Sequence, residues 1–225
     1  MHQRGIPVGR IVMLAVGLVV VAIFATAPRS AHSADAAPLS GPQLLGRLRA
    51  GGCVLVMRHA RSPEATPDAR SANSDNPHRE RQLDEAGKAG ARAFGAAVRA
   101  LHVPIGLIYS SPTYRARETV QFARLGEAKV VEQLSESKHG MSGAAERSQT
   151  EWLRRAVAQS PPAGSNTLIV THTPNIVGAF GNRASGIGAG ESLIFEPRQD
   201  GSTRLLGRIT VDEWQKLAGQ HAERR

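Results

Sequence analysis

The chain has 225 residues, which suffices for one well-cored domain and is rather short for two. Its 28 lysines and arginines against 19 acidic residues give a net charge of +9, which favours anionic partners such as phosphates, acidic polymers or membrane headgroups. Aromatic residues make up only 4% of the chain and no basic stripe is interleaved with them, which argues against a nucleic-acid partner.

The first 36 residues are typical of a targeting segment. A basic start precedes an apolar run over residues 11–27, and a cleavage site of the A-x-A type ends at Ala36. We therefore expect residues 1–36 to be a signal peptide and residues 37–225 to form a single periplasmic or secreted domain. The alternative is an uncleaved membrane anchor over residues 11–27, because a membrane span needs about 20 apolar residues. Contact with a membrane is expected only in that case.

The chain has one cysteine, Cys53, and can therefore form no internal disulfide. Because Cys53 begins an apolar segment, we expect a buried and unreactive thiol. The sequence contains no C-x-x-C, H-E-x-x-H or Asp-rich pattern. It therefore indicates neither a metal site nor a cofactor.

Beyond residue 52, short apolar runs typical of strands alternate with segments of helical periodicity. The predicted strands are 53–59, 105–110, 128–134, 166–172, 191–197 and 203–210. The predicted helices are 83–101, 111–123, 145–160, 174–181 and 211–219. Asp84 is expected to cap the first helix, and Ser111 and Pro112 to form the cap and first position of the second.

This alternation implies right-handed crossovers and a mainly parallel sheet. Residues 198–202, "RQDGS", carry a hairpin signal, so the last two strands should add antiparallel pairing at an edge. We therefore expect a three-layer α/β fold with helices on both faces of the sheet.

Basic side chains follow three of the predicted parallel strands. The first strand ends at Arg58 and His59, the second leads into a helix whose first turn carries Arg115, and the fourth ends at His172. In an open α/β sheet, ligands bind beyond the carboxyl ends of the parallel strands. Guanidinium groups match the oxygens of a phosphoryl group, and a neutral imidazole can attack phosphorus in line. The pattern predicts a pocket for a phosphoryl dianion, in which arginines replace magnesium.

The segments "VMRHAR", "SSPTYRARET" and "VTHTPN" resemble the histidine phosphatase superfamily, which also contains the phosphoglycerate mutases. The resemblance covers roughly residues 53–214, with the elements in the expected order. It implies a phosphatase that works through a phosphohistidine intermediate. Carried over to this chain, it makes His59 the nucleophile, with Arg58, Arg115 and His172 binding the phosphoryl group.

The chain departs from the family pattern at Ala60, which replaces the glycine of the usual R-H-G. A backbone with negative φ tolerates this change. The segments "RHARSP" and "HT" differ from the R-H-G-x-R-x-P and H-D patterns of the acid phosphatase and phytase branch. The chain, without a large helical insertion, is more similar to the compact branch that includes the bacterial phosphohistidine phosphatases.

A proton donor for the leaving group is the least determined part of the predicted site. Family members that cleave phosphate esters generally place a carboxylate after the third strand, and Glu136 lies there. Glu132, Glu80 and Asp75 are the alternatives to Glu136. An alcohol needs protonation far more than an imidazole does, so a chain without this acid would act on phosphohistidine or another good leaving group.

A long polar loop over residues 62–82 is expected to be functional or disordered, as loops of this length are in compact domains. The predicted rim of the pocket is basic, with Arg61, His78, Arg79, Arg81, Lys138 and His139. These side chains would recognise a second anionic group or an acidic protein, or would form an ordinary basic surface. Arg61, beside the signature, is the rim candidate for substrate binding.

We therefore expect a metal-independent phosphatase acting on a small anionic phosphorylated substrate or on a phosphoprotein. A phosphate-binding or scaffold protein with poor turnover is the alternative, motivated by Ala60 and the undetermined acid. A phosphoglycerate mutase fits export poorly, because its substrate is cytosolic.

Overall fold

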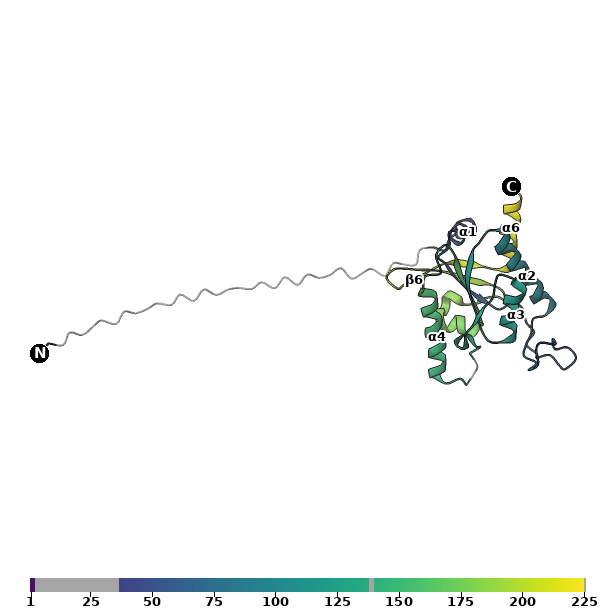
Figure 1. The fold of residues 1–225 in the computed structure, drawn as a ribbon, viewed down its shortest axis with the longest axis horizontal. Coiled ribbons are helices and arrows are strands. Elements are labelled where there is room, and N and C mark those ends of the chain that lie inside the picture. The colour runs from purple at the N-terminus through teal and green to yellow at the C-terminus, as the bar shows by residue number, and fades with distance from the viewer. Residues whose placement is uncertain (3–36, 138–139, 225) are drawn as a thin grey trace. The chain divides into compact units, whose positions relative to one another are not determined.

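The computed structural model describes residues 1–2, 37–137 and 140–224 (Figure 1). Residues 35–225 group into one compact unit. The predicted signal peptide or anchor lies outside the described residues, as do Lys138 and His139 of the predicted rim. Within the described part of the chain, no helix is both long and apolar enough to cross a membrane.

Six strands form one sheet in the order β3-β2-β4-β1-β5-β6. Their bounds are β1 (Val54–Arg58), β2 (Ile105–Ser110), β3 (Lys129–Val130), β4 (Asn166–Thr171), β5 (Ser192–Pro197) and β6 (Thr203–Ile209). The first four pair in parallel, whereas β5 and β6 form an antiparallel hairpin that places β6 at the edge. The predicted mainly parallel sheet with a late edge hairpin is confirmed.

The helices cover both faces of this sheet, as predicted (Figure 1). They are α1 (Gly41–Ala50), α2 (Glu85–Ala100), α3 (Tyr114–Ala123), α4 (Gly143–Ala158), α5 (Thr173–Phe180) and α6 (Val211–Ala222), with short 3₁₀ helices η1 (Glu132–Leu134) and η2 (Gly181–Ala184). Apolar residues of α1, α2, α3 and α6 pack in one core, and those of α4 and α5 pack in a second.

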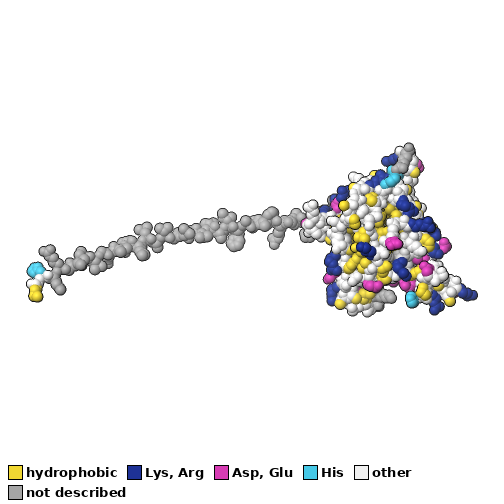
Figure 2. All heavy atoms as spheres, in the orientation of Figure 1, with side chains coloured by type: hydrophobic (Ala, Val, Ile, Leu, Met, Phe, Trp, Pro, Cys, Tyr) yellow, Lys and Arg dark blue, Asp and Glu magenta, His cyan; other side chains and the backbone are white. Residues whose placement is uncertain are grey.

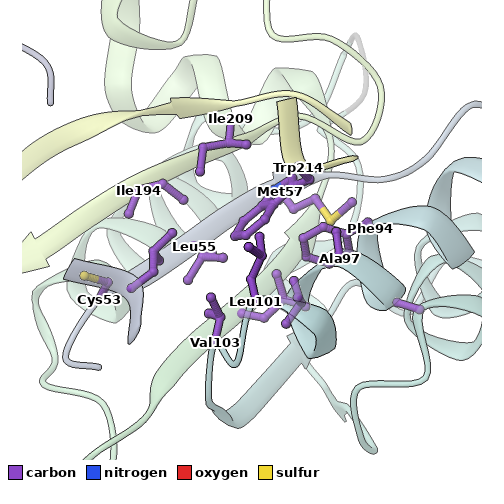
Figure 3. Packing of buried hydrophobic residues seen from close by; sticks show 14 of the residues in the cluster. Cys53, Leu55, Met57, Phe94, Ala97, Leu101, Val103, Ile194, Ile209 and Trp214 are labelled. Atoms are coloured by element: carbon purple, nitrogen blue, oxygen red, sulfur yellow. The ribbon is translucent and has the colours of Figure 1, made fainter. Parts of the chain in front are cut away.

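β1 contributes to both cores, which explains its unbroken apolar sequence. Leu55 and Met57 lie in one core with Phe94 of α2 and Trp214 of α6 (Figure 3), whereas Val56 belongs to the opposite core. A strand covered on both faces needs apolar side chains at successive positions, because successive side chains point to opposite faces. The sheet thereby holds the end of β1 in place.

Helix α1 was not among the predicted helices. It begins after Ser40, whose backbone N–H donates to Gln43 Oε1 at 3.1 Å, and it buries Leu44 and Leu48 in the first core. The S-x-x-Q spacing and the Leu spacing are the local signals for this helix.

Two predicted boundaries are wrong. Strand β3 has only two residues, because the chain turns into η1 after residue 131. Helix α3 begins at Tyr114 with Thr113 as the N-terminal flanking residue, so Ser111 and Pro112 precede the helix. The hydroxyl of Ser111 accepts from the backbone N–H of Thr113 at 3.3 Å and also lies 2.9 Å from a ring nitrogen of His172, a tertiary partner that the sequence did not indicate.

Other local predictions are confirmed. Asp84 caps α2, and its Oδ1 accepts from the backbone N–H of Gly87 at 2.7 Å. Ala60 is not among the described residues with positive φ, so its backbone needs no glycine. Cys53 is fully buried, and this burial raises the pKa of its thiol to about 11, as expected for an unreactive cysteine.

Candidate active site

The carboxyl ends of β1, β2 and β4 meet at one edge of the sheet. Arg58 pairs with Thr171 across β1 and β4, and Ser110 pairs with Val170 across β2 and β4. This register brings the side chains that follow the three strands together. Arg58, His59, Arg115 and His172, predicted from three separate segments, lie at this edge, and Arg115 contacts both histidine rings.

His59 is a buried imidazole whose two nitrogens face different kinds of partner. Nδ1 lies 2.7 Å from the carbonyl oxygen of Ala60, which only accepts, so Nδ1 carries the hydrogen. Nε2 accepts from Arg115 Nε at 3.2 Å. Burial, together with the charges of Arg115 and Arg58, lowers the pKa of His59 to about 3. The ring is therefore neutral, with its lone pair on Nε2.

His172 lies beside it, with the ring centroids 5.2 Å apart. Its Nδ1 is 3.0 Å from Arg115 Nη2, and its Nε2 is 2.9 Å from Ser111 Oγ. Burial lowers the pKa of His172 to about 2, with Arg115 and His59 as further causes. This ring is neutral as well.

Arg115 connects the site and is only 4% exposed. Besides the two rings, its Nη2 contacts Glu136 Oε2 at 2.8 Å. Burial lowers the pKa of Arg115, and Glu136 opposes that shift. The hydroxyl of Thr119 accepts from the backbone N–H of Ala60 at 3.0 Å and donates to the carbonyl of Arg115 at 2.8 Å. Helix α3 is thus tied to the turn that carries His59.

Glu136 is the predicted carboxylate that reaches this group. Its alternatives have other partners among the described residues: Glu80 accepts from the backbone N–H of Tyr114 at 3.0 Å, and Asp75 accepts from the Tyr114 hydroxyl. Glu132 is exposed on η1. Geometry therefore favours Glu136 over the other three.

Arg58 is fixed by a segment between α5 and β5 that sequence reasoning missed. Its Nη1 donates to the carbonyl of Ile187 at 3.0 Å. Glu191 holds that segment, accepting from the backbone N–H of Gly188 at 2.7 Å and from Arg208 Nε at 2.6 Å. No local sequence pattern predicts this clamp of Glu191 on Gly188 and Arg208, because Arg208 lies on a different strand.

The family model of the histidine phosphatase superfamily (branch 1) matches residues 54–168, just over half of the chain. The chain belongs to the histidine phosphatase superfamily. It is therefore a phosphatase of the histidine-nucleophile type, and its predicted membership of the family is confirmed. Comparison with curated protein sequences finds no match.

Solved structures support this fold. A candidate phosphohistidine phosphatase SixA from Agrobacterium tumefaciens has 19% sequence identity and a TM-score of 0.50, covering 71% of this chain and 98% of that chain. A candidate α-ribazole-5′-phosphate phosphatase from Escherichia coli K-12 has 16% identity and a TM-score of 0.51, covering 72% and 98%. At such identities the likeness shows that this histidine phosphatase shares their fold.

On the rim of this histidine phosphatase, the Arg61 side chain is 69% exposed and pairs with Asp84 at the start of α2 at 3.0 Å, and its role in substrate binding stays a prediction. The charge of Arg81 helps to lower the pKa of both His59 and His172. Its Nε donates to the carbonyl of Pro63 at 2.7 Å.

The two other rim residues that the structure describes, His78 and Arg79, are exposed on the 62–82 loop. On the face seen in Figure 2, Lys and Arg side chains are spread out with Asp and Glu among them. That face therefore carries no single basic stripe.

The 62–82 loop contains no helix or strand and packs on α3. Glu118, 2% exposed, accepts from the backbone N–H of Leu83 at 2.6 Å and from Asn73 Nδ2 at 2.8 Å. Burial raises the pKa of Glu118. With the contacts of Glu80 and Asp75 on Tyr114, these bonds make the loop a side wall of the active site.

The described residues contain no group of three or more His, Cys, Asp or Glu side chains placed to hold a metal ion. The positive charge at this site comes from Arg58, Arg81 and Arg115. Guanidinium groups at fixed positions can stabilise the charge on phosphoryl oxygens during transfer.

Proposed function

We propose that the protein is an exported, metal-independent phosphatase that hydrolyses a phosphomonoester or a phosphohistidine through a phosphohistidine intermediate on His59. The observation that carries the proposal is the unprotonated Nε2 of His59, which accepts from Arg115 Nε at 3.2 Å while Nδ1–H is held by the Ala60 carbonyl. A neutral imidazole in this tautomer is a nucleophile aimed at an anion site.

In the first step, Arg58, Arg115 and His172 bind the phosphoryl oxygens and His59 Nε2 attacks phosphorus. An N–P bond forms, the bond from phosphorus to the leaving group breaks, and the Nδ1–H bond to Ala60 stabilises the positive charge on the ring. Glu136 is the carboxyl group placed to protonate the leaving group. This geometry makes positioning and electrostatic stabilisation the main contributions of the protein.

In the second step, water attacks the phosphorus of the phosphohistidine. The N–P bond breaks, Glu136 takes the proton of the water, and phosphate leaves with His59 neutral again. The same carboxyl group thus acts as acid in one step and as base in the other.

The substrate class follows from the charges of the rim and the need for a proton donor. Arg81 gives the site a cation beyond the two that a single phosphoryl group requires, which suits a small substrate with a second anionic group or a phosphoprotein. A phosphohistidine substrate needs Glu136 least, because imidazole is a good leaving group. Export rests on the basic start, the apolar run and the A-x-A site of residues 1–36.

A family member that keeps the phosphate site but turns over slowly is the second candidate. The observation that favours it is the contact between Glu136 Oε2 and Arg115 Nη2 at 2.8 Å, because it engages the candidate acid with an arginine of the site. Such a protein would bind phosphate or vanadate at the same residues without releasing a leaving group.

The test is hydrolysis of p-nitrophenyl phosphate in EDTA by the purified protein and by His59→Ala, with His78→Ala as the control at an exposed histidine. We expect turnover in the wild type and the control and none in His59→Ala. Quenching in alkaline detergent, which preserves phosphohistidine, should trap a phosphoenzyme that His59→Ala lacks. Vanadate binding without turnover of p-nitrophenyl phosphate or a phosphohistidine peptide would select the phosphate-binding protein.

The intact mass of the protein tests the proposed export separately from the activity. The intact mass of the protein recovered from cells should correspond to a chain that begins after Ala36. An uncleaved amino terminus would overturn the signal-peptide prediction and leave the membrane anchor.

A further inference from the structure

Two hydroxyl groups lie behind His172, on the side of the ring away from Arg115. Ser111 is fully buried, and its Oγ lies 2.9 Å from His172 Nε2. Thr113 Oγ1 lies 3.2 Å from the same nitrogen. The two side chains also contact each other, with 3.2 Å between their oxygens, so they form one unit, which we call the hydroxyl pair.

The hydrogen positions on His172 follow from what its partners can do. Arginine carries only donors, so His172 Nδ1, 3.0 Å from Arg115 Nη2, must accept. A neutral imidazole has one N–H group, which is then on Nε2 and donates to the hydroxyl pair. A hydroxyl can fill this role because its oxygen accepts while its hydrogen turns elsewhere.

His59 has the opposite arrangement around the same guanidinium. Its hydrogen is on Nδ1, bonded to the Ala60 carbonyl, and its lone pair is on Nε2. Arg115 therefore contacts one lone pair from each ring. The Ala60 carbonyl fixes the tautomer of His59, whereas Arg115 and the hydroxyl pair together fix that of His172.

We propose that Ser111, with Thr113, is a positioning residue that fixes the Nε2–H tautomer of His172 and so presents Nδ1 to Arg115 and to the phosphoryl group. The catalytic consequence rests on the proposed function, whereas the tautomer does not.

The consequence for the reaction concerns the nitrogen that meets substrate. When a bound phosphoryl group accepts the hydrogen bond from Arg115 Nη2, Nδ1 of His172 loses that donor and faces a phosphoryl oxygen. It can accept from a P–OH group, or it can take up one proton and donate to a P–O⁻ group. In both cases Nε2–H stays on the hydroxyl pair, so the ring keeps its orientation. Without the pair, the N–H can move to Nδ1 or the ring can turn.

The direct test is the two-bond ¹H–¹⁵N spectrum of the purified protein with ¹⁵N-labelled histidine, in which protonated and unprotonated ring nitrogens have different shifts. His172→Gln assigns the signals. We expect wild-type His172 to show protonated Nε2 and bare Nδ1, and Ser111→Ala, in which only Arg115 and Thr113 still favour this tautomer, to show a partial shift toward protonated Nδ1. Ser111→Thr, which restores a hydroxyl, should recover the wild-type pattern.

Ser110→Ala is the matched control. Ser110 is also fully buried and adjacent, but its hydroxyl donates to the carbonyl of Ser111 at 3.0 Å and has no bond to His172. We expect this variant to keep the wild-type tautomer. Should Ser111→Ala fail to fold, Thr113→Val removes the other hydroxyl and is expected to shift the tautomer in part.

The catalytic readout is kcat/KM for the best phosphorylated substrate. We expect Ser111→Ala to lower it about 10- to 100-fold, less than the ~10⁴-fold loss seen when a charged orienting group is removed from a catalytic histidine, because a hydroxyl carries no charge. Unprotonated Nε2 in the wild type, or an unchanged His172 tautomer in folded Ser111→Ala and Thr113→Val, would overturn the proposal. A tautomer shift in a protein without turnover would retain the positioning role and refute only the phosphatase mechanism.

Discussion

A single substitution at Arg115 tests the proposed role of its guanidinium group in binding the phosphoryl group. Its Nε contacts His59, and its Nη2 contacts His172 and Glu136. Arg115→Lys keeps the positive charge but replaces a planar fork by one compact ammonium group. That group cannot reach both ends of the former fork, so a contact to at least one ring is lost.

The magnitude follows from the number of lost donors. Loss of one fixed donor at a position where charge develops costs about 10²- to 10³-fold in kcat. We therefore expect Arg115→Lys to lower kcat/KM by about 10²- to 10³-fold, even though the net charge of the protein is unchanged. A mechanism that needed only a positive charge at this position would predict little loss.

The assay is steady-state hydrolysis of a phosphomonoester, with thermal unfolding to show that the variant is folded. Arg117→Lys is the control, because Arg117 lies on the same helix and is exposed, with its guanidinium carbon 5.7 Å from the centroid of the Tyr114 ring. We expect the control to stay within about twofold of wild type, as for a surface charge with no role in the reaction. Folded Arg115→Lys with activity within about threefold of wild type would refute the role of the guanidinium fork.

Three further outcomes follow from packing and burial. Gly87→Ala should lower the free energy of unfolding by roughly 1–3 kcal/mol, because the new Cβ would lie 1.9 Å from the backbone oxygen of Arg61. Gly90→Ala, on the same helix but with open space around it, should raise the free energy of unfolding by up to about 1 kcal/mol. Urea unfolding measures both. Glu191→Ala should cost roughly 1–3 kcal/mol and lower kcat/KM, because the segment that holds Arg58 loses its clamp. The low pKa values of His59 and His172 mean that the unfolded chain binds more protons between pH 3 and 6.5, so stability is full above pH 6.5 and falls below it. At pH 5 the free energy of unfolding should be lower than at pH 7 by about 2 kcal/mol for each ring. His59→Gln should remove the part of this pH dependence that His59 contributes.

Each of these three predictions has a result that would contradict it. Equal stabilities of the two glycine variants would contradict the close approach at Gly87. Unchanged kcat/KM in folded Glu191→Ala would contradict the clamp on Arg58. A stability that stays flat from pH 7 to pH 5 would show that the rings are not held neutral.

Much of the fold could be predicted from the sequence because its signals are local. The apolar run before Arg58 and the capped helix at Asp84 depend on neighbouring residues alone. The meeting of Arg58, His59, Arg115 and His172 then followed from the rule that parallel strands end at one edge.

The errors arose where a side chain has a distant partner. Ser111 has the sequence of a helix cap, but its hydroxyl bonds to His172, 61 residues away. The sequence also did not indicate the pairing of Arg61 with Asp84, and the role of Arg61 in substrate binding stays a prediction. Glu191 bonds to Arg208 across the hairpin, and the spacing of neither residue indicates this. Such contacts are set by the packed sheet and helices and not by local sequence.

The central place of β1 in the sheet also affects how the site can move. Its edges are bonded to β4 on one side and to β5 on the other, whereas the 62–82 wall is held to α3 by a few side-chain bonds. Amide hydrogens of such an interior strand exchange with solvent only through openings close to global unfolding, while a loop can open alone. His59, which would carry the phosphoryl group, therefore follows β1, the strand whose amide hydrogens we expect to exchange slowly. The 62–82 loop beside it can open for substrate entry and phosphate release without moving His59.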